Sequence, residues 1–373
     1  MPLYHGTGLI VSSAALLSGI AVAVTPRFSV SNFWPDVHDS ESTMFIYVGE
    51  TARYLLAAPP HPLERDHKLR MCYGNGMRPD VWQKFQDRFN VPSVAEFFNS
   101  SEGMFSLVVW AKNNYLRGCV GHHGLIWRRV LHNVYIPVRF DYESGDIYRD
   151  PKTGFAQRVP YEEGGEIMVA IPNKEAFGGY WRNEEATNKR FATNVFKKGD
   201  IYYRAGDALR RALDGHWFFL DRLGDTFRWK SENVSTAEVA LALGEYPGIA
   251  EANVYGVQIP GHEGRAGCAA INLDTAHESS GLDYAGLLDY ARSRLPRYAV
   301  PVFLRIVQRS SHIHNHKQNK VGLRKEGVDP EKIGIEESAG VDDVFMIAKP
   351  GTNAYASFDK DDWMALVNGQ LRL

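Results

Sequence analysis

Two short stretches decide how this chain is divided: GDIYYRAGD, residues 199–207, and DRLGDTFRWK, residues 221–230. The first places Asp207 directly after a strand and a glycine turn, where a carboxylate can accept hydrogen bonds from a pair of hydroxyl groups such as those of a ribose. Taken alone, a Gly-Asp pair is a common turn. The second stretch is a charged, glycine-containing turn that follows a strand-like segment. We therefore expect a domain boundary there, with domains at residues 1–220 and 221–373.

Ahead of this boundary, short apolar runs alternate with helical patterns, which predicts βα units over a mostly parallel sheet. The texture becomes turn-rich between residues 103 and 166, which favours a small β-barrel-like subdomain. The expected elements are helices from residue 9, near Val37, at 50–56 and at 79–89, and strands at 20–24, 44–48, 69–73 and 94–98.

Beyond the boundary, the patterns predict a separate small α+β domain. Its expected elements are helices at 236–243 and 284–295 and strands at 250–257, 267–273 and 302–307. The fold class is therefore α/β, with a large domain followed by a small C-terminal domain.

The apolar stretch 9–24 resembles a signal peptide or a membrane helix in composition. It has no basic residue ahead of it, and its serines and Gly19 leave it short of the roughly 20 strongly apolar residues that a membrane span requires. We therefore expect a buried helix that ends near Gly19, followed by the strand at 20–24.

Composition limits the partners of the chain. Lys and Arg total 42 and Asp and Glu total 44, so the formal net charge of -2 provides no field that would gather nucleic acid. Three widely spaced cysteines, Cys72, Cys119 and Cys268, fit reduced packing residues better than a disulfide framework or a zinc site.

The run 196–239 closely resembles the signature of fatty acid transport proteins and very-long-chain acyl-CoA synthetases, which are adenylate-forming enzymes. In that family a Gly-Asp strand end, an Asp-Arg-x-Gly-Asp turn and a Phe-Arg-Trp-Lys stretch occur in this order. A match over so many rare residues, Trp229 included, is far more specific than a short motif. The resemblance extends to residues 2–5, Pro-Leu-Tyr-His, and to the closing motif that begins at Lys317.

The resemblance implies a role for each matching residue. The turn Gly74, Asn75 and Gly76 would lie along the adenine of a nucleotide, Phe98 would stack on it, and Ser101 would touch phosphate. Glu102 would hold Mg²⁺, Asp207 with Arg222 would grip the ribose, and Lys317 would be the adenylation lysine. Attack of a carboxylate on the α-phosphate of ATP builds negative charge, which a metal ion, a lysine and fixed donors stabilise.

Simpler interpretations stay open for three of these residues. Glu102 could be a charge at a helix N-terminus, Arg222 a surface salt-bridge partner, and Lys317 one member of a solvated polar run. That run contains three alternating histidines, 312, 314 and 316, but no acidic or cysteine partner, so it favours a loop over a metal site.

The chain also departs from the family. We find no Ser/Thr/Gly-rich loop ending in Pro-Lys, which would wrap the β- and γ-phosphates and which the family carries ahead of residues 2–5. The resemblance therefore predicts a partial, truncated large domain that binds AMP or acyl adenylate better than it turns over ATP, with apolar sheet surface left exposed. Asn99 and Ser231 stand where the family usually has glycine.

The function implied by the resemblance is ATP-dependent activation of a long-chain or very-long-chain fatty acid, with ATP, Mg²⁺ and CoA as cofactors. Two alternatives remain: a CoA ligase for another carboxylic acid such as a secondary-metabolite precursor, and an inactive relative that only binds. We expect no nucleic-acid partner, and peripheral membrane association on the cytoplasmic side or in a peroxisome. The oligomeric state is left open.

We predict a hinge at Gly224 and Asp225, because a glycine absorbs the backbone rotation when two domains move against each other. Limited proteolysis of the native chain should cut first at this turn, and mass spectrometry should identify a fragment ending near residue 224. A chain that resists cleavage there as one rigid unit would contradict the hinge.

Overall fold

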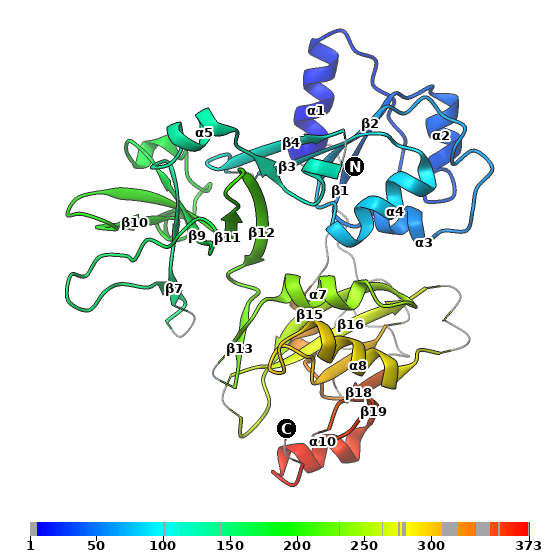
Figure 1. The fold of residues 1–373 in the computed structure, drawn as a ribbon, viewed down its shortest axis with the longest axis vertical. Coiled ribbons are helices and arrows are strands. Elements are labelled where there is room, and N and C mark those ends of the chain that lie inside the picture. The colour runs from blue at the N-terminus through cyan, green and yellow to red at the C-terminus, as the bar shows by residue number, and fades with distance from the viewer. Residues whose placement is uncertain are drawn as a thin grey trace. The chain divides into compact units, whose positions relative to one another are not determined.

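The computed structural model describes residues 6–99, 102–112, 114–141, 144–230, 232–262, 264–274, 277, 281–307, 320–330, 332, 344–349, 351–371 and 373 (Figure 1). Its internal contacts divide the chain into two compact units. Unit 1 comprises Met1–Arg70, Gly76–Val91 and Asp225–Leu373, and unit 2 comprises Met71–Asn75 and Pro92–Gly224. One unit limit thus falls between Gly224 and Asp225, whereas the division at residues 220 and 221 stays a prediction.

Unit 2 is built on a six-stranded sheet whose central strand is β11 (Ile201–Arg211). Its order is β5 (Gly121–His122), β12 (His216–Arg222), β11, β9 (Gly165–Ala170) and β6 (Tyr135–Val138), and β10 (Phe191–Thr193) also pairs with β11. Every pairing is antiparallel. Through the described residues this sheet is an open path, so the predicted barrel-like region does not close.

A second sheet in unit 2 contains β2 (Met71–Asn75), β3 (Val94–Asn99) and β4 (Ser106–Ala111). The β2 and β3 strands are parallel, as predicted, but β4 is antiparallel to β3. Only six residues join β3 to β4, too few for the crossover of a dozen or more that a parallel pair requires. The sheet is therefore mixed.

The shorter elements of unit 2 lie around these sheets. They are the helices α5 (Leu125–Val130) and α6 (Glu184–Asn188), the 3₁₀ turns at Asn114–Leu116 and Lys174–Ala176, and the hairpin of β7 (Phe140–Asp141) and β8 (Asp146–Ile147).

The first part of unit 1 confirms most of the predicted elements. It contains α1 (Gly6–Leu17), α2 (Phe33–Asp39), β1 (Met44–Val48), α3 (Thr51–Ala57) and α4 (Pro79–Phe89). Pro79 opens α4 at a position where its missing N–H costs nothing, and Asn90 ends it in the left-handed conformation.

Two predictions for the apolar stretch near the start are wrong. Residues 20–24 form no strand, and Ile20 and Val24 are exposed. Helix α1 is not buried: only Thr7 and Gly8 are, while Leu9, Ile10, Leu16 and Leu17 face outward. Local β propensity predicted a strand, but a strand also needs a hydrogen-bonded neighbour, which the structure does not supply to this segment.

The remainder of unit 1 is a five-stranded sheet in the order β15 (Ile249–Val257), β16 (Ala266–Leu273), β17 (Phe303–Ile306), β18 (Val344–Ile347) and β19 (Ala356–Phe358). Helices α7 (Thr236–Gly244) and α8 (Tyr284–Arg294) pack beside it (Figure 1). The hairpin of β13 (Phe227–Trp229) and β14 (Glu232–Val234) precedes it, and α9 (Val321–Glu326) and α10 (Lys360–Val367) complete it. The elements predicted for residues 236–307 are thus confirmed, and the limits of a separate domain stay a prediction.

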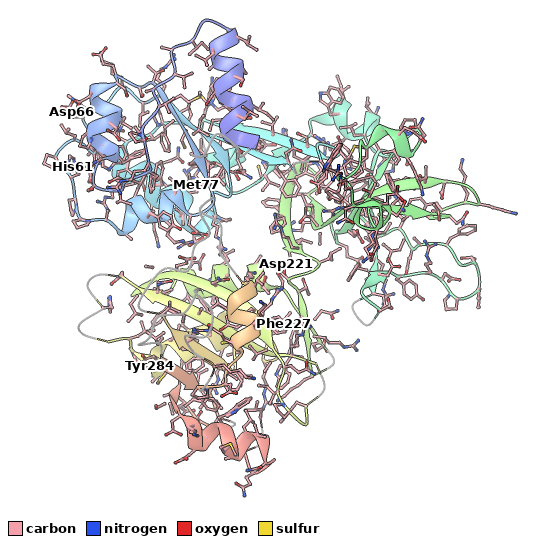
Figure 2. All side chains as sticks on the ribbon, turned by 180° about the vertical axis from the view of Figure 1, so that it is seen from behind. His61, Asp66, Met77, Asp221, Phe227 and Tyr284 are labelled. Atoms are coloured by element: carbon pink, nitrogen blue, oxygen red, sulfur yellow. The ribbon has the colours of Figure 1, made fainter. Side chains whose placement is uncertain are left out.

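The first strand of that hairpin is attached to the sheet by Phe227, which Figure 2 labels. Its buried ring lies over Gly256 and Gly267, where an added Cβ would approach the ring to 2.6 and 3.3 Å. The three cysteines are free and buried, as predicted. No helix in the described part of the chain has the length and apolar character needed to cross a membrane.

A buried ion pair lies in the core of unit 1. The Arg305 guanidinium on β17 and the Glu326 carboxylate at the end of α9 are 2.6 Å apart, and their side chains are 0% and 2% exposed. Removing one member of such a pair leaves an uncompensated charge in a low-dielectric interior, which typically costs about 3 to 5 kcal/mol.

We therefore predict that Glu326→Gln lowers the free energy of unfolding of unit 1 by about 3 kcal/mol, measured by urea denaturation. The control is Glu185→Gln, which breaks the exposed helical pair between Glu185 and Lys189 and should leave the midpoint unchanged. Equal midpoints for the two variants would show that Arg305 does not depend on Glu326.

Candidate functional site

A backbone irregularity in β11 positions the first candidate acid. The pairing of β11 with β9 shifts register between Arg204 and Ala208, and Gly206 within that interval has φ +73°. A bulge of this kind bends a strand and redirects its side chains, and glycine adopts the required positive φ without strain. The sequence placed Asp207 after the end of a strand; it instead lies inside β11, at the bulge.

Cross-strand pairing places Asp207 beside Arg222, as the family resemblance implied. The two residues are register partners across β11 and β12, and Arg222 Nε lies 3.7 Å from Asp207 Oδ1. Burial raises the pKa of Asp207 to about 6, because little water remains to solvate the ionised form. The side chains of Arg222 and Arg190 act in the opposite direction, and Glu102 and Glu166 add repulsion.

Asp207 is thus a largely buried carboxylate with weak compensation. Its side chain is 15% exposed, and Arg222, whose side chain is 62% exposed, is too distant for a strong hydrogen bond. By comparison, Glu166 in the same sheet is held by Arg204 through two hydrogen bonds of 2.9 and 2.7 Å. Asp207 therefore retains acceptor capacity that a ligand could use, whereas Glu166 serves the fold.

A second acid, Glu102, is held by two residues that the sequence analysis missed. Arg190 Nη2 lies 3.0 Å from Glu102 Oε1, and Tyr180 donates a short hydrogen bond from its hydroxyl to the same oxygen. Arg190 Nε donates to the Tyr180 hydroxyl at 2.8 Å. Burial, followed by the hydrogen bond to Glu102, raises the pKa of Tyr180.

Arg190 also connects Glu102 to the bulge. An ideal Cβ on Gly206 would lie 3.1 Å from Arg190 Nη1, so the missing side chain leaves room for the guanidinium. This places the Arg190 cation near both acids, Glu102 and Asp207, and repulsion by Glu102 contributes to the raised pKa of Asp207. No spacing rule could have found Arg190, because 88 residues separate it from Glu102.

Phe98, at the end of β3, belongs to the same unit. Its half-buried ring packs at centroid distances of 5.6 Å from Phe105 and 5.9 Å from Phe219. Phe219 lies on β12, three residues before Arg222, so the packing joins the aromatic candidate to the strand that carries the arginine. Asp221, labelled in Figure 2, precedes Arg222 and is buried.

The predicted adenine turn falls at a limit between units. Gly74 and Asn75 end β2 in unit 2, and Asn75 has a buried side-chain oxygen without a hydrogen-bond partner in the described structure. Gly76 belongs to unit 1, where φ +96° and the approach of Gly49 Cα to 3.1 Å of an added Cβ require glycine. Gly74 and Asn75 are therefore described within unit 2, and Gly76 within unit 1.

Two of the predicted residues lie outside the described residues: Ser101 and Lys317. Ser231, the serine at a usual glycine position, also lies outside them. For metal binding, the described residues contain no group of three or more His, Cys, Asp or Glu side chains that could hold an ion. A Mg²⁺ ion at Glu102 would therefore take its other ligands from phosphate oxygens and water, the usual arrangement for this cation.

Comparisons with known proteins agree on one family. The profile described as AMP-binding enzyme matches residues 1–181, and the profile described as AMP-binding enzyme C-terminal domain matches residues 238–317. Isopenicillin N epimerase component 1 of Hapsidospora chrysogena is 53% identical over 99% of this chain and 61% of that protein. A very long-chain fatty acid transport protein of Cochliobolus heterostrophus is 40% identical over 100% of this chain and 57% of that protein.

A medium/long-chain-fatty-acid–CoA ligase of Mycobacterium tuberculosis is 38% identical over 89% of this chain and 53% of that protein. The chain thus spans about half to three fifths of the length of these relatives. Among solved structures, ATP-bound MatB from Rhodopseudomonas palustris has a TM-score of 0.67 at 20% identity, covering 87% of this chain and 58% of that one. At this identity the similarity concerns the fold.

The raised pKa of Asp207 makes a prediction for stability. Because the folded pKa of about 6 exceeds the ordinary 3.8, proton binding stabilises the fold fully below the ordinary value, and this contribution is lost as the pH rises through about 6. The variant Asp207→Asn has no carboxylate to titrate at this position and does not lose this contribution. The free energy of unfolding of the variant minus that of the unaltered chain should therefore increase by about 1 to 2 kcal/mol from about pH 5 to about pH 8.

Urea denaturation at the two pH values measures this difference. The control is Glu163→Gln, which changes an exposed residue. Its free energy of unfolding should differ from that of the unaltered chain by the same amount at both pH values. A difference between Asp207→Asn and the unaltered chain that does not vary with pH would contradict the raised pKa.

Proposed function

Since this chain belongs to the AMP-binding enzyme family, alongside the very-long-chain fatty acid transport proteins, we propose that it acts in ATP-dependent formation of acyl-CoA. A long-chain or very-long-chain fatty acid would first be joined to ATP as an acyl adenylate and then transferred to CoA. Because the chain spans only part of the length of its relatives, the activity of the whole protein is part of this proposal.

The observation that carries the proposal is the environment of Asp207. A ribose offers two neighbouring hydroxyl donors, and a carboxylate with weak compensation is the acceptor that gains most from them. With a pKa of about 6, Asp207 is mostly ionised at neutral pH and can accept both donors. Arg222, its cross-strand partner, would hold the carboxylate in register with the sugar.

Phe98 and the end of β2 are proposed to hold the base. The Phe98 ring is fixed by Phe105 and Phe219, so it presents a rigid apolar face for stacking. Asn75 supports the assignment of the adenine turn Gly74, Asn75 and Gly76, because its unpartnered buried oxygen could accept a hydrogen bond.

Glu102 is the proposed residue for Mg²⁺. The charge and hardness of a carboxylate suit this ion, and Arg190 now compensates the same carboxylate. A bound Mg²⁺ would neutralise charge on the phosphates of ATP. Arg190 would then be left beside the nucleotide as a second positive group, and Tyr180 would keep Glu102 oriented.

Ser101 and Lys317 are proposed to contact phosphate and to stabilise the charge that develops during adenylation. Their assignment is based on the sequence pattern. CoA would approach near Ser231, where the family usually has a glycine that leaves room for close backbone approach.

A second acid class is favoured by one relative. The protein that is 53% identical to this chain is named isopenicillin N epimerase component 1, which points to a secondary metabolite rather than a fatty acid. Under this alternative the adenylation chemistry is unchanged and only the carboxylic acid differs. A third alternative, an inactive relative that binds nucleotide only, predicts binding without turnover.

The proposed setting is the cytoplasmic face of a membrane or a peroxisome, where fatty acids are available. The names of the fatty acid transport relatives support a lipid-associated role. The part of the chain that the structure describes contains no membrane-spanning helix, so association of this part would be peripheral.

The nucleotide assignment is tested by calorimetric titration with adenosine, which has the ribose diol but no titrating phosphate. Asp207→Asn should weaken binding about tenfold or more, because hydrogen bonds to a charged acceptor contribute about 1.5 to 3 kcal/mol. The control Glu163→Gln should bind as the unaltered chain does. Unchanged affinity in Asp207→Asn would remove Asp207 from the site.

The reaction is tested by exchange of labelled pyrophosphate into ATP with Mg²⁺ and either oleate or isopenicillin N. Exchange that depends on oleate supports the fatty acid, and exchange that depends only on isopenicillin N supports the second acid class. Adenosine binding without exchange with either acid would contradict adenylation by this chain and favour the binding-only alternative.

A further inference from the structure

Helix α5 in unit 2 is exposed over its whole length. None of its residues is buried, and Leu125, Ile126, Trp127 and Val130 are between 58% and 76% exposed. Four large apolar side chains in a helix of six residues are costly to leave in water. The described part of the chain does not cover them.

The turn between β11 and β12 extends this apolar surface. His123, just before α5, donates its backbone N–H to the Gly215 carbonyl at 2.9 Å, and His122 Nε2 lies 3.2 Å from the Asp214 carbonyl. Leu213, at the tip of the turn, is 79% exposed. We call Leu125, Ile126, Trp127, Val130 and Leu213 the α5 patch.

The α5 patch is accompanied by positive charge. Arg128 and Arg129 lie in the last turn of α5, and Arg129 is exposed. Arg211, which is near Arg128, is 7% exposed. In the described structure, Arg211 Nη1 and Arg128 Nε are buried and have no hydrogen-bond partner. Burial lowers the pKa of Arg211, with smaller contributions in the same direction from Arg128 and Arg158, and Tyr161 and Glu162 act in the opposite direction.

Few acids offset these cations. Asp214 pairs with His216, 2.8 Å away, and Glu162 raises the pKa of Arg211. The α5 patch therefore combines aliphatic side chains and a tryptophan, and Arg128 and Arg129 lie beside it. This is the composition of a segment that lies in the interface of an anionic membrane, with apolar groups among acyl chains and cations among headgroups.

We propose that the α5 patch docks unit 2 onto the surface of a bilayer that contains anionic phospholipid. With six residues, α5 is about 9 Å long, which suits shallow insertion and not a span. A protein partner is less suitable, because a specific interface buries about 800 Å² on each side from about 20 to 30 residues. The five apolar residues of the patch fall well short of that number.

Helix α1 in unit 1 provides an internal comparison. It also exposes large apolar residues, among them Leu16 and Leu17, but contains no charged residue. An uncharged surface does not discriminate between neutral and anionic lipid. A requirement for anionic lipid therefore distinguishes docking through α5 from adhesion through α1.

The test is flotation of the 373-residue chain with vesicles of phosphatidylcholine, with and without phosphatidylserine, in the absence of nucleotide. Binding should require phosphatidylserine and weaken at high salt, because salt screens the arginines. The double variant Ile126→Ser and Trp127→Ser, and separately Arg129→Glu, should each lose about tenfold or more in affinity. Thermal melting should be unchanged, because these side chains are exposed.

Two controls make the result specific. Trp181→Ser removes an 87% exposed tryptophan elsewhere in unit 2, and the double variant Leu16→Ser and Leu17→Ser alters α1. Both should float with the vesicles as the unaltered chain does. The proposal is overturned by binding that ignores phosphatidylserine, by undiminished binding of the α5 variants, or by loss of binding in the α1 variant.

A self-association surface is excluded by light scattering. If the unaltered chain forms dimers and the α5 double variant is monomeric, α5 is an interface between copies and the proposal fails. None of these measurements involves ATP or an acid, so failure of membrane docking and failure of the proposed function are separate outcomes.

Discussion

The backbone of β11 is the constraint on which unit 2 depends. This strand pairs with β9, β10 and β12, so its course determines where the side chains of the whole sheet point. Pairing of β11 with β12 places Asp207 opposite Arg222, and at the irregularity around Gly206 the missing side chain leaves room for Arg190.

Buried charges in this protein are of two kinds. Arg305 with Glu326, and Arg204 with Glu166, are close pairs with short hydrogen bonds, and they belong to the fold. Asp207 is largely buried, at 15% exposed, but the arginine paired with it lies 3.7 Å away. A protein tolerates such a group when the free-energy cost of burying it is small compared with the total stability. Poorly compensated charges of this kind are found mainly at binding and catalytic sites. This contrast, more than any single motif, supports Asp207 as a ligand contact.

Exposure of apolar side chains also has two forms here. Helix α1 exposes them without any charged residue. Helix α5 exposes them beside Arg128 and Arg129, and Arg211 lies near Arg128. The same hydrophobic effect acts on both helices. Only the second has an electrostatic preference, and this preference makes it possible to name a kind of surface and to test it.

The sequence by itself determined the order and type of most elements, because the strands 44–48 and 94–98 and the helix 79–89 carry strong local patterns. It also determined the family, through the rare residues of 196–239, and the resemblance to that family paired Asp207 with Arg222. The prediction of a strand at 20–24 was wrong, because whether a segment pairs with a neighbouring strand depends on the tertiary structure. Only the tertiary structure decided that Asp207 lies in a bulge and that Tyr180 and Arg190 hold Glu102, since contacts across 78 and 88 residues depend on how sheets meet and leave no trace in local spacing.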